Sequence, residues 1–461
     1  MRKRYVLAIV LSLAVALTTI VPGLAQSTTK SLSTNFTLVN LGSEALAGVI
    51  EYFKSDGSAW GDGSEEFTIT DPGGQAIFRQ YYPPGEPGNP NLTDGAGSVV
   101  VSADQPVGAV AQILARLPQD PTSSGAYSGL SAGDTSFYVP LAARMLGTAS
   151  GLANSQIIVQ NTGASAVDVE IEMIAPDGTS TYTKGGINIA AGASYYYDLA
   201  DESATNVPDA WYGSAVASAT SAGGEIAVVS NFFTGDAMQT FNAFASASPG
   251  TTWFVPLFTS RLANSLSTPI AVQNLSGGAI AAGGVVVTCS PDSACTVPGF
   301  AMSNDTALGD TASYFFNPVT DMTIPELFYG SCVVEASADV VSFVQMRFIA
   351  TGEAAAYEAI KGGSTDTKVI VPLAAKRLGN GFATAITIQN LNTTATATVD
   401  LTYRRSPDCS VGNVIYQFAG QSIPPGGSLI QNLRVPSGPG SVPSIPDTWF
   451  GTLVVQGNQP I

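Results

Sequence analysis

The sequence predicts an all-β protein made of four tandem immunoglobulin-like β-sandwich modules of about 116 residues, the last one incomplete. Three observations lead to this fold class: a phrase that recurs at a fixed distance, period-two alternation of apolar residues, and regularly spaced turn signals. The recurring phrases are FYVPLAARML, WFVPLFTSRL and VIVPLAAKRL. Their prolines, Pro140, Pro256 and Pro372, lie 116 residues apart in both intervals. Equal spacing indicates copies of one folding unit.

The segment after each phrase predicts a strand. These segments read SQIIVQN, TPIAVQN and TAITIQN, and TNFTLVN near the N-terminus matches them without a preceding VPL phrase. Large apolar residues stand two and four positions before the final asparagine, as Val159 and Ile157 do before Asn161. Such alternation is typical of a half-buried strand. Four matching segments predict four units, the first without its opening phrase.

Turn signals divide each unit into about seven short strands. The turns include SDG, PDG and SPD, and a later Gly-containing corner such as AAGAS or PPGGS precedes an aromatic or aliphatic strand. Spacings of this kind favour a β-sandwich, whereas a β-propeller blade is usually only about 40–50 residues long. The VPL phrase is expected to be the first strand of each sandwich, entered through a Gly/Ser/Thr-rich hinge. A proline in a strand predicts an edge or a bulge.

The N-terminus predicts export. MRKR is followed by the apolar run YVLAIVLSLAVALTTI and by small residues ahead of Gln26, which is the pattern of a cleaved signal peptide. The predicted boundaries are therefore a signal peptide at 1–25 and modules at 26–135, 136–250, 251–366 and 367–461. The apolar run is short for a membrane anchor, which needs about 20 residues. The mature protein is expected to be secreted, extracellular and at the cell surface, with no membrane contact after cleavage.

Composition argues against nucleic acid as a partner. The chain has 35 acidic and 18 basic residues, a formal net charge of −17, and no basic cluster beyond its first four residues. A surface of that sign repels phosphate backbones. Because 45% of the residues are apolar, the chain is expected to fold in spite of a charged fraction of only 11%.

The sequence predicts no enzyme activity. It contains no histidine, which is the commonest general base and metal ligand. We predict no catalytic residue, no cofactor and no metal site. The recurring turn aspartates are expected to bind their own backbone rather than calcium. They are Asp56, Asp177, Asp292 and Asp408.

Aromatic and basic residues that recur have two interpretations. The run Tyr195–Tyr197 resembles a sugar-stacking platform, but packing in the core is favoured because other units place different large apolar residues there. Trp211, Phe328 and Trp449 precede a glycine by two positions and are expected to fill the core. Three arginines after the VPL phrase are either recognition residues or solvated charges at module junctions. They are Arg144, Arg261 and Arg377.

Cysteines suggest one disulfide in the third unit. Cys289, Cys295 and Cys332 all fall there, and both Cys289–Cys295 and Cys289–Cys332 pairings are open on sequence grounds. The first two units contain no cysteine, so the fold does not depend on disulfides. Zinc is not expected, because there is no histidine and no CxxC pair.

The fourth unit is about two strands shorter than the others. Each core strand contributes roughly 5–9 kcal/mol of apolar burial, so the fourth unit is not expected to be stable alone. Two explanations are open: the sequence is truncated after Ile461, or a neighbouring molecule donates the missing strand.

The repeated phrasing VPL…R…IxVQN…PDG…PGGS…WYGS resembles tandem immunoglobulin-like repeat proteins secreted to the bacterial cell surface. The resemblance concerns architecture and implies no ligand residues. It implies a non-catalytic structural spacer, adhesin or surface-layer component, whose partners are other surface proteins, extracellular polysaccharide or a copy of itself. Two alternatives are an array of carbohydrate-binding modules from a larger enzyme truncated after residue 461, and a filament subunit assembled by strand exchange.

Overall fold

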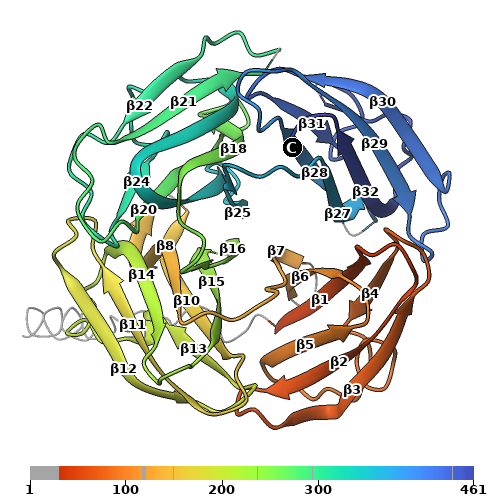
Figure 1. Cartoon of the computed structure of the whole chain (residues 1–461), viewed down its shortest axis with the longest axis horizontal. Helices are drawn as coiled ribbons and strands as arrows, with labels where there is room; N and C mark the ends of the chain where they lie inside the picture. The colour runs from red at the N-terminus through yellow and green to blue at the C-terminus, as the bar shows by residue number, and fades with distance from the viewer. Residues whose placement is uncertain are drawn as a thin grey trace, which may run out of the picture.

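The computed structural model describes residues 31–116, 121–148, 150–235, 237–292, 294–379, 381–438 and 440–461. Within these ranges strands form seven sheets, and the helical structure is a short 3-10 helix, η1 (Leu199–Asp201). The all-β class predicted from the sequence is confirmed. The sheets gather in four regions around a ring, and the C-terminal region lies beside the N-terminal one (Figure 1).

The first two regions run from red to green in Figure 1. The first contains β1 (Ser31–Asn40), β2 (Leu46–Lys54), β3 (Ala59–Ile69), β4 (Gln75–Arg79), β5 (Gly97–Ala103), β6 (Val107–Arg116) and β7 (Pro121–Ser128). The second contains β8 (Ser136–Arg144), β9 (Leu146–Thr148), β10 (Gly151–Asn161), β11 (Val167–Ile174), β12 (Thr181–Ile189), β13 (Ser194–Asp198), β14 (Trp211–Ala219), β15 (Ile226–Thr234), β16 (Ala237–Asn242) and β17 (Phe244–Ala245). Each region has two sheets, ordered β4-β1-β6-β7 and β3-β2-β5, then β13-β10-β15-β16 and β12-β11-β14-β8-β17.

The third and fourth regions complete the ring. The third contains β18 (Gly250–Ser260), β19 (Leu266–Ser267), β20 (Ile270–Asn274), β21 (Val285–Pro291), β22 (Phe300–Ser303), β23 (Ser313–Phe316), β24 (Phe328–Phe348), β25 (Ala354–Glu358) and β26 (Ile360–Lys361). Its long strand β24 pairs with β18 and β21 through its first half and with β20 and β25 through its second. The fourth contains β27 (Lys368–Ala375), β28 (Ala385–Gln389), β29 (Ala397–Arg405), β30 (Ile415–Ile423), β31 (Ser428–Asn432) and β32 (Phe450–Gly457), in sheets β27-β32-β29-β30 and β28-β31.

Apolar side chains from facing sheets form the cores. In the first region Phe36 of β1 stacks on Phe78 of β4 at 5.0 Å, and Phe67 of the other sheet meets Phe78 edge-on at 5.8 Å. The second and third regions share one continuous core, which Phe241 and Phe343 join with ring centroids 4.1 Å apart. The first and fourth regions each have a separate core. Burial of these large rings is the main source of stability in each region.

The recurring VPL phrase forms strands β8, β18 and β27. These strands pair with β14, β24 and β32. In all three pairs the proline and leucine of the phrase oppose a single residue of the neighbouring strand, which is a β-bulge. The bulge explains how a strand inside a sheet tolerates proline, which cannot donate a ladder hydrogen bond.

The residue opposite each bulge joins its region to the next one. Its hydroxyl donates a hydrogen bond to a carbonyl in the Gly-containing corner of the following region: Ser214 to Thr311 (2.7 Å) and Ser331 to Gly426 (2.9 Å). The first region makes the same contact from Ser98 to Gly192 (2.8 Å). The fourth region makes it with the first, from Thr452 to Gly73 (3.3 Å), so the ring closes through a contact of the same kind.

A glycine precedes each of these hydroxyl residues for a steric reason. A Cβ atom at Gly213 would lie 2.0 Å from the carbonyl oxygen of Ile174, and one at Gly451 would lie 2.0 Å from that of Arg404. Gly97 and Gly330 face carbonyl oxygens at 1.9 and 2.1 Å. Real Cβ atoms do not approach this closely, so the Gly-Ser or Gly-Thr pair is required at all four junctions.

The ring corrects the expectation that the units follow one another through hinges. The predicted hinge before β8 is fixed: Asp134 and Ile226 exchange two backbone hydrogen bonds, and the Ser246 hydroxyl donates to the Asp134 carboxylate. The regions surround an axis, as propeller blades do, although the first, second and fourth have two sheets each and long β24 joins the strands of the third into one. Among the described residues no helix has the length and apolarity needed to cross a bilayer. The predicted signal peptide, 1–25, lies outside the described residues.

Candidate functional site

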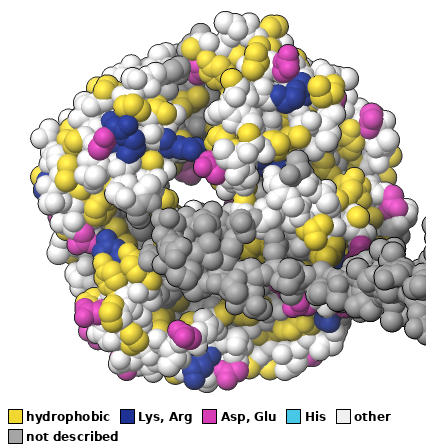
Figure 2. Space-filling view, turned by 180° about the vertical axis from the view of Figure 1, so that it is seen from behind, with side chains coloured by type: hydrophobic (Ala, Val, Ile, Leu, Met, Phe, Trp, Pro, Cys, Tyr) yellow, Lys and Arg dark blue, Asp and Glu magenta, His cyan; other side chains and the backbone are white. Residues whose placement is uncertain are grey.

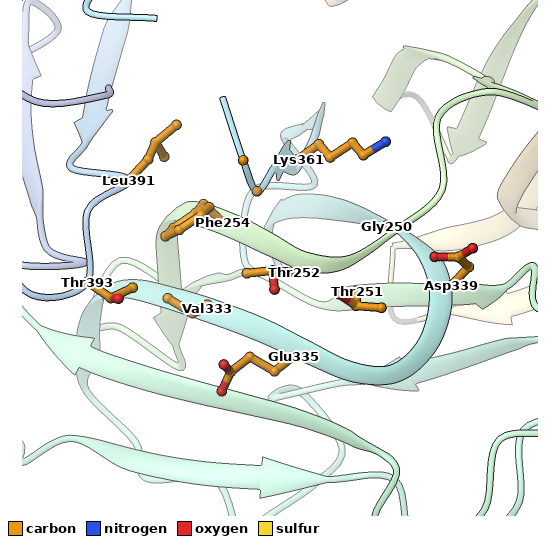
Figure 3. Close-up of a pocket in the computed structure, with 12 residues that line it drawn as sticks. Gly250, Thr251, Thr252, Phe254, Val333, Glu335, Asp339, Lys361, Leu391 and Thr393 are labelled. Atoms are coloured by element: carbon orange, nitrogen blue, oxygen red, sulfur yellow. The ribbon is translucent and has the colours of Figure 1, made fainter. Parts of the chain in front are cut away.

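A cavity of about 570 Å³ opens where the third region meets the fourth (Figure 3). Strand β18 contributes Thr252 and Phe254, and β24 contributes Glu335 and Asp339. The loop after β28 adds Leu391. Figure 3 shows the Glu335 and Asp339 carboxylates pointing in different directions.

The cavity offers hydrogen bonds and little apolar surface. Phe254 is buried, so its ring face is not available for stacking on a sugar. Lys361 and Thr393 complete the polar lining. In the part of the chain that the structure describes, no three His, Cys, Asp or Glu side chains are grouped to hold a metal ion. The arrangement suits a weakly bound polar ligand.

Three strands from different regions meet at the centre of the ring. We call β7, β16 and β25 the central strands (Figure 1). Asn242 connects them: its amide Nδ2 donates to the Ser128 carbonyl (2.9 Å) and its backbone N–H donates to Glu358 (3.1 Å). The Gln345 side-chain Nε2 donates to the Gln239 side-chain Oε1 (3.0 Å). The centre of the ring is therefore a polar contact between regions.

Glu358 is the titratable group in this contact. Burial raises its pKa to about 7, and the hydrogen bonds from Asn242 oppose the shift. A carboxyl group with this pKa changes charge near neutral pH, unlike an exposed glutamate.

The recurring basic residues bind backbone carbonyls. Arg144 donates to the Glu202 carbonyl and pairs with Asp209, and Lys376 donates to the carbonyls of Val442 and Ile445, both at 2.6 Å. In the third region the cation stands one position later: Arg261 donates to carbonyls of the loop after β23. These cations hold loops within their own regions.

Arg377 aligns with Arg261 but has a different partner. Both residues have a left-handed backbone, with φ of 44°. Arg377 forms a two-pronged pair with the Asp447 carboxylate. Arg377 is half-exposed and Asp447 is exposed, so the pair adds little stability.

The turn aspartates accept hydrogen bonds from their own turns. Asp177 accepts from the backbone N–H groups of Thr179 and Ser180, which lowers its pKa to about 2. Asp56 and Asp292 accept in the same way from the residue two positions on. Asp408 instead faces Arg79 of the first region at 3.9 Å, across the ring closure.

Cys289 and Cys332 are joined by a disulfide between β21 and β24. Cys295 is a free thiol in this structure, as is the buried Cys409 of the fourth region. Of the two pairings open from the sequence, the structure therefore contains the cross-strand one.

The recurring aromatic residues lie mainly in the cores. Trp211, Phe328 and Trp449 are buried. Tyr197 is buried as well, whereas Tyr196 is half-buried and donates a hydrogen bond from its hydroxyl to the Gly97 carbonyl of the first region (3.0 Å). The tyrosine run therefore packs in the core and at a junction and does not form an exposed platform.

Sequence reasoning missed the roles of two sets of residues. The strand-ending asparagines are fully buried, and each donates from Nδ2 to two or three carbonyls and accepts from the residue two positions on. They are Asn40, Asn161, Asn274 and Asn390. The junction hydroxyls are the second set. Both sets recur in all four units, and this recurrence is the signal that could have identified them.

Comparisons with known proteins do not assign the chain to a family. No protein-family model matches it, and no curated protein sequence is similar to it. A crystal structure of Thermotoga maritima 1070 aligns with 24% of this chain and 95% of its own length, at 13% identity and a TM-score of 0.19. The surface layer protein SbsC, domains 1–6, aligns with 87% of this chain and 62% of its own length, at 10% identity and a TM-score of 0.08.

Charged side chains are dispersed on the face that Figure 2 shows. Acidic and basic groups alternate around the ring without a single-sign patch.

Proposed function

We propose that the protein is a non-catalytic secreted or cell-surface protein whose ring is a structural or adhesive component. The observation that carries the proposal is the set of four equivalent junctions, from Ser98, Ser214, Ser331 and Thr452, which use the recurring polar residues for assembly. The recurring cations and asparagines are likewise used for structure. A closed ring suits a surface component or adhesin better than an extended spacer.

The four regions are also proposed to be the four immunoglobulin-like units. Two sheets in the first, second and fourth regions, and the recurrence of the same junction in all four, support this assignment. The domain limits 26–135, 136–250, 251–366 and 367–461 stay predictions. Limited proteolysis tests them, because cleavage is expected first in exposed loops between regions.

The localisation test uses intact cells of the source organism. A membrane-impermeant amine-reactive label is expected to modify the protein on the surface, and mass spectrometry is expected to find a mature N-terminus at Gln26. A cytosolic protein serves as the control for cell lysis. Recovery of only unlabelled protein with residues 1–25 still attached would overturn the proposal.

The carbohydrate-binding alternative has one supporting observation. Tyr212 is 42% exposed and lies beside Phe315 with ring centroids 5.6 Å apart, so it presents an accessible aromatic face. Sedimentation with insoluble polysaccharides tests this alternative. Retention of the wild type and release of the Tyr212→Ala variant would favour it, whereas equal behaviour of both would exclude this tyrosine as the contact. The strand-exchange alternative depends on open sheet edges.

A further inference from the structure

Strand β28 has an open edge in the described part of the chain. Each of its counterparts has a neighbouring strand on both sides. Strand β1 lies between β4 and β6, β10 lies between β13 and β15, and β20 lies between β23 and β24. Strand β28 pairs with β31 and, among the described residues, with no other strand. The position held by β6, β15 and the second half of β24 is therefore open in the fourth region.

The chain already makes the first contact of a flanking strand at this edge. The residue after each strand-ending asparagine donates its backbone N–H to the strand that flanks it: Leu41 to Pro106, Thr162 to Glu225 and Leu275 to Asp339. Leu391 donates to Pro460 in the same way (2.9 Å). Ile461 thus occupies the position of Val107, Ile226 and Val340, where the other three flanking segments continue along the edge.

Exposure of the neighbouring β27 is consistent with this opening. Val369 is 38% exposed, whereas its counterparts Phe137 and Trp253 are 0% and 2% exposed. Val371 is half-buried, whereas Val139 is fully buried. In the second region β15 covers the corresponding face of β8. The fourth region lacks that cover among the described residues.

A second open edge lies on β5 of the first region. Its counterparts β14, β24 and β32 pair with the VPL strands β8, β18 and β27, and β5 has no such neighbour among the described residues. Val99 and Val101 are half-buried there, whereas Ala215 and Ala217 of β14 are fully buried.

One segment of the repeat would fill both edges. In each complete case the chain runs from the flanking strand through a central strand into the VPL strand of the next region, as residues 226–260 do, over about 35 residues. The next region after the fourth is the first, because the ring closes through Thr452 and Gly73. The two edges therefore match two strands of one such segment.

We propose that the edges of β28 and β5 together form an acceptor for one polypeptide segment of the repeat's own sequence type, entering beside Ile461. The segment first supplies a strand at the β28 edge that combines apolar residues with Ser, Asn or Gln, like IAVVSNFFT of β15. It then supplies a central strand between β25 and β7, and last a VPL strand at the β5 edge. Main-chain hydrogen bonds supply the affinity, and the alternate side chains supply the specificity. The inference stands on the sheet edges, so it can hold even where the surface localisation fails.

The probe is a synthetic peptide of this chain's residues 225–260, added to the full chain. Hydrogen exchange at the β28 amides is the readout. Because N–H groups alternate sides along a strand, those of Thr387 and Gln389 face the open edge, and we expect their exchange to slow at least tenfold. A peptide of the same composition in scrambled order is the control. Equal protection by both peptides would overturn the proposal.

A second experiment joins the same residues to the chain, after Ile461. The extended chain is expected to show protection at β28 and β5, a higher Tm than a chain extended with the scrambled order, and loss of binding to the free peptide. Thr387→Pro removes an N–H of the open edge only, so it is expected to leave the Tm of the unextended chain within a few degrees and to abolish peptide binding. Absence of protection at β28 with both the free and the joined segment would contradict the proposal.

Discussion

The second and fourth regions show what the same repeat does with and without its last strands. Both have the bulged VPL strand, a buried tryptophan and a buried strand-ending asparagine: Trp211 and Asn161 in one, Trp449 and Asn390 in the other. The second region merges its core with that of the third, whereas the fourth has a core of its own. The bulged VPL strand, the tryptophan and the asparagine corner are therefore common to a region that shares its core and to one that does not.

The largest effect on stability is expected when each buried tryptophan is replaced by alanine. Trp449→Ala and Trp211→Ala are each expected to cost about 3–5 kcal/mol of unfolding free energy, because a buried aromatic ring is lost. Trp449→Ala is expected to add a separate early transition in guanidinium unfolding, since the fourth core is isolated. Trp211→Ala is expected to lower the midpoint of the shared second and third core. The control variant is Tyr212→Ala, at an exposed position next to Trp211. One common transition for both tryptophan variants would show that the cores are not separate.

The next effect concerns the strand-ending asparagines. Asn161→Ala removes donors to the Ser165 and Ile189 carbonyls (2.8 and 2.9 Å) and an acceptor for Gly163. Leaving buried carbonyls unsatisfied costs about 1–3 kcal/mol. Asn390→Ala removes equivalent bonds to Ala395 and Ile423.

We expect these two asparagine variants to lose similar amounts of stability, because the corner does not involve the missing strands. Chemical denaturation measures both. The exposed Asn188→Ala is the matched control, with a change within about 0.5 kcal/mol. A much smaller loss for Asn390→Ala would show that the corner of the incomplete region is loosely formed.

The sequence was sufficient for the all-β class, because strands depend on local alternation, and proline's missing N–H narrowed the VPL strand to an edge or a bulge. It was not sufficient for the ring. Ring closure depends on Thr452 meeting Gly73, residues separated by nearly the whole chain, and no local pattern encodes that distance. The loop-binding role of Arg144 was missed for the same reason, since its carbonyl partner at Glu202 belongs to a loop of no regular pattern.

A smaller, pH-dependent effect tests the contact at the ring centre. Glu358 has a folded pKa of about 7, above its ordinary value near 4.5, so the folded state binds its proton more tightly than the unfolded state. Its contribution to stability is fully present below about pH 4.5 and is lost as the pH rises through 7. We expect Tm to fall between pH 5 and pH 8 and the Glu358→Gln variant to show a flatter profile. The exposed Glu353→Gln is the control. A profile unchanged by Glu358→Gln would contradict the assignment.

The smallest expected effect is the one that decides whether the ring is closed in solution. Thr452→Val and Ser214→Ala each remove one junction hydroxyl, at a cost of about 1 kcal/mol. The two junctions differ in support. Gln273 adds an amide bond from the third region to the Ala215 carbonyl (3.4 Å), whereas the first region has Val39 at the corresponding position and makes no such bond. The chain also continues directly from the second region into the third but not from the fourth into the first.

Thr452→Val is therefore expected to raise hydrogen exchange at β1 and β27, the strands that meet at the ring closure, while Ser214→Ala leaves exchange at β14 and β20 nearly unchanged. Small-angle scattering is expected to show a larger radius of gyration for Thr452→Val alone, because a ring opened at one junction extends. Equal exchange and equal radii for the two variants would mean that the fourth and first regions are held together by more than this junction.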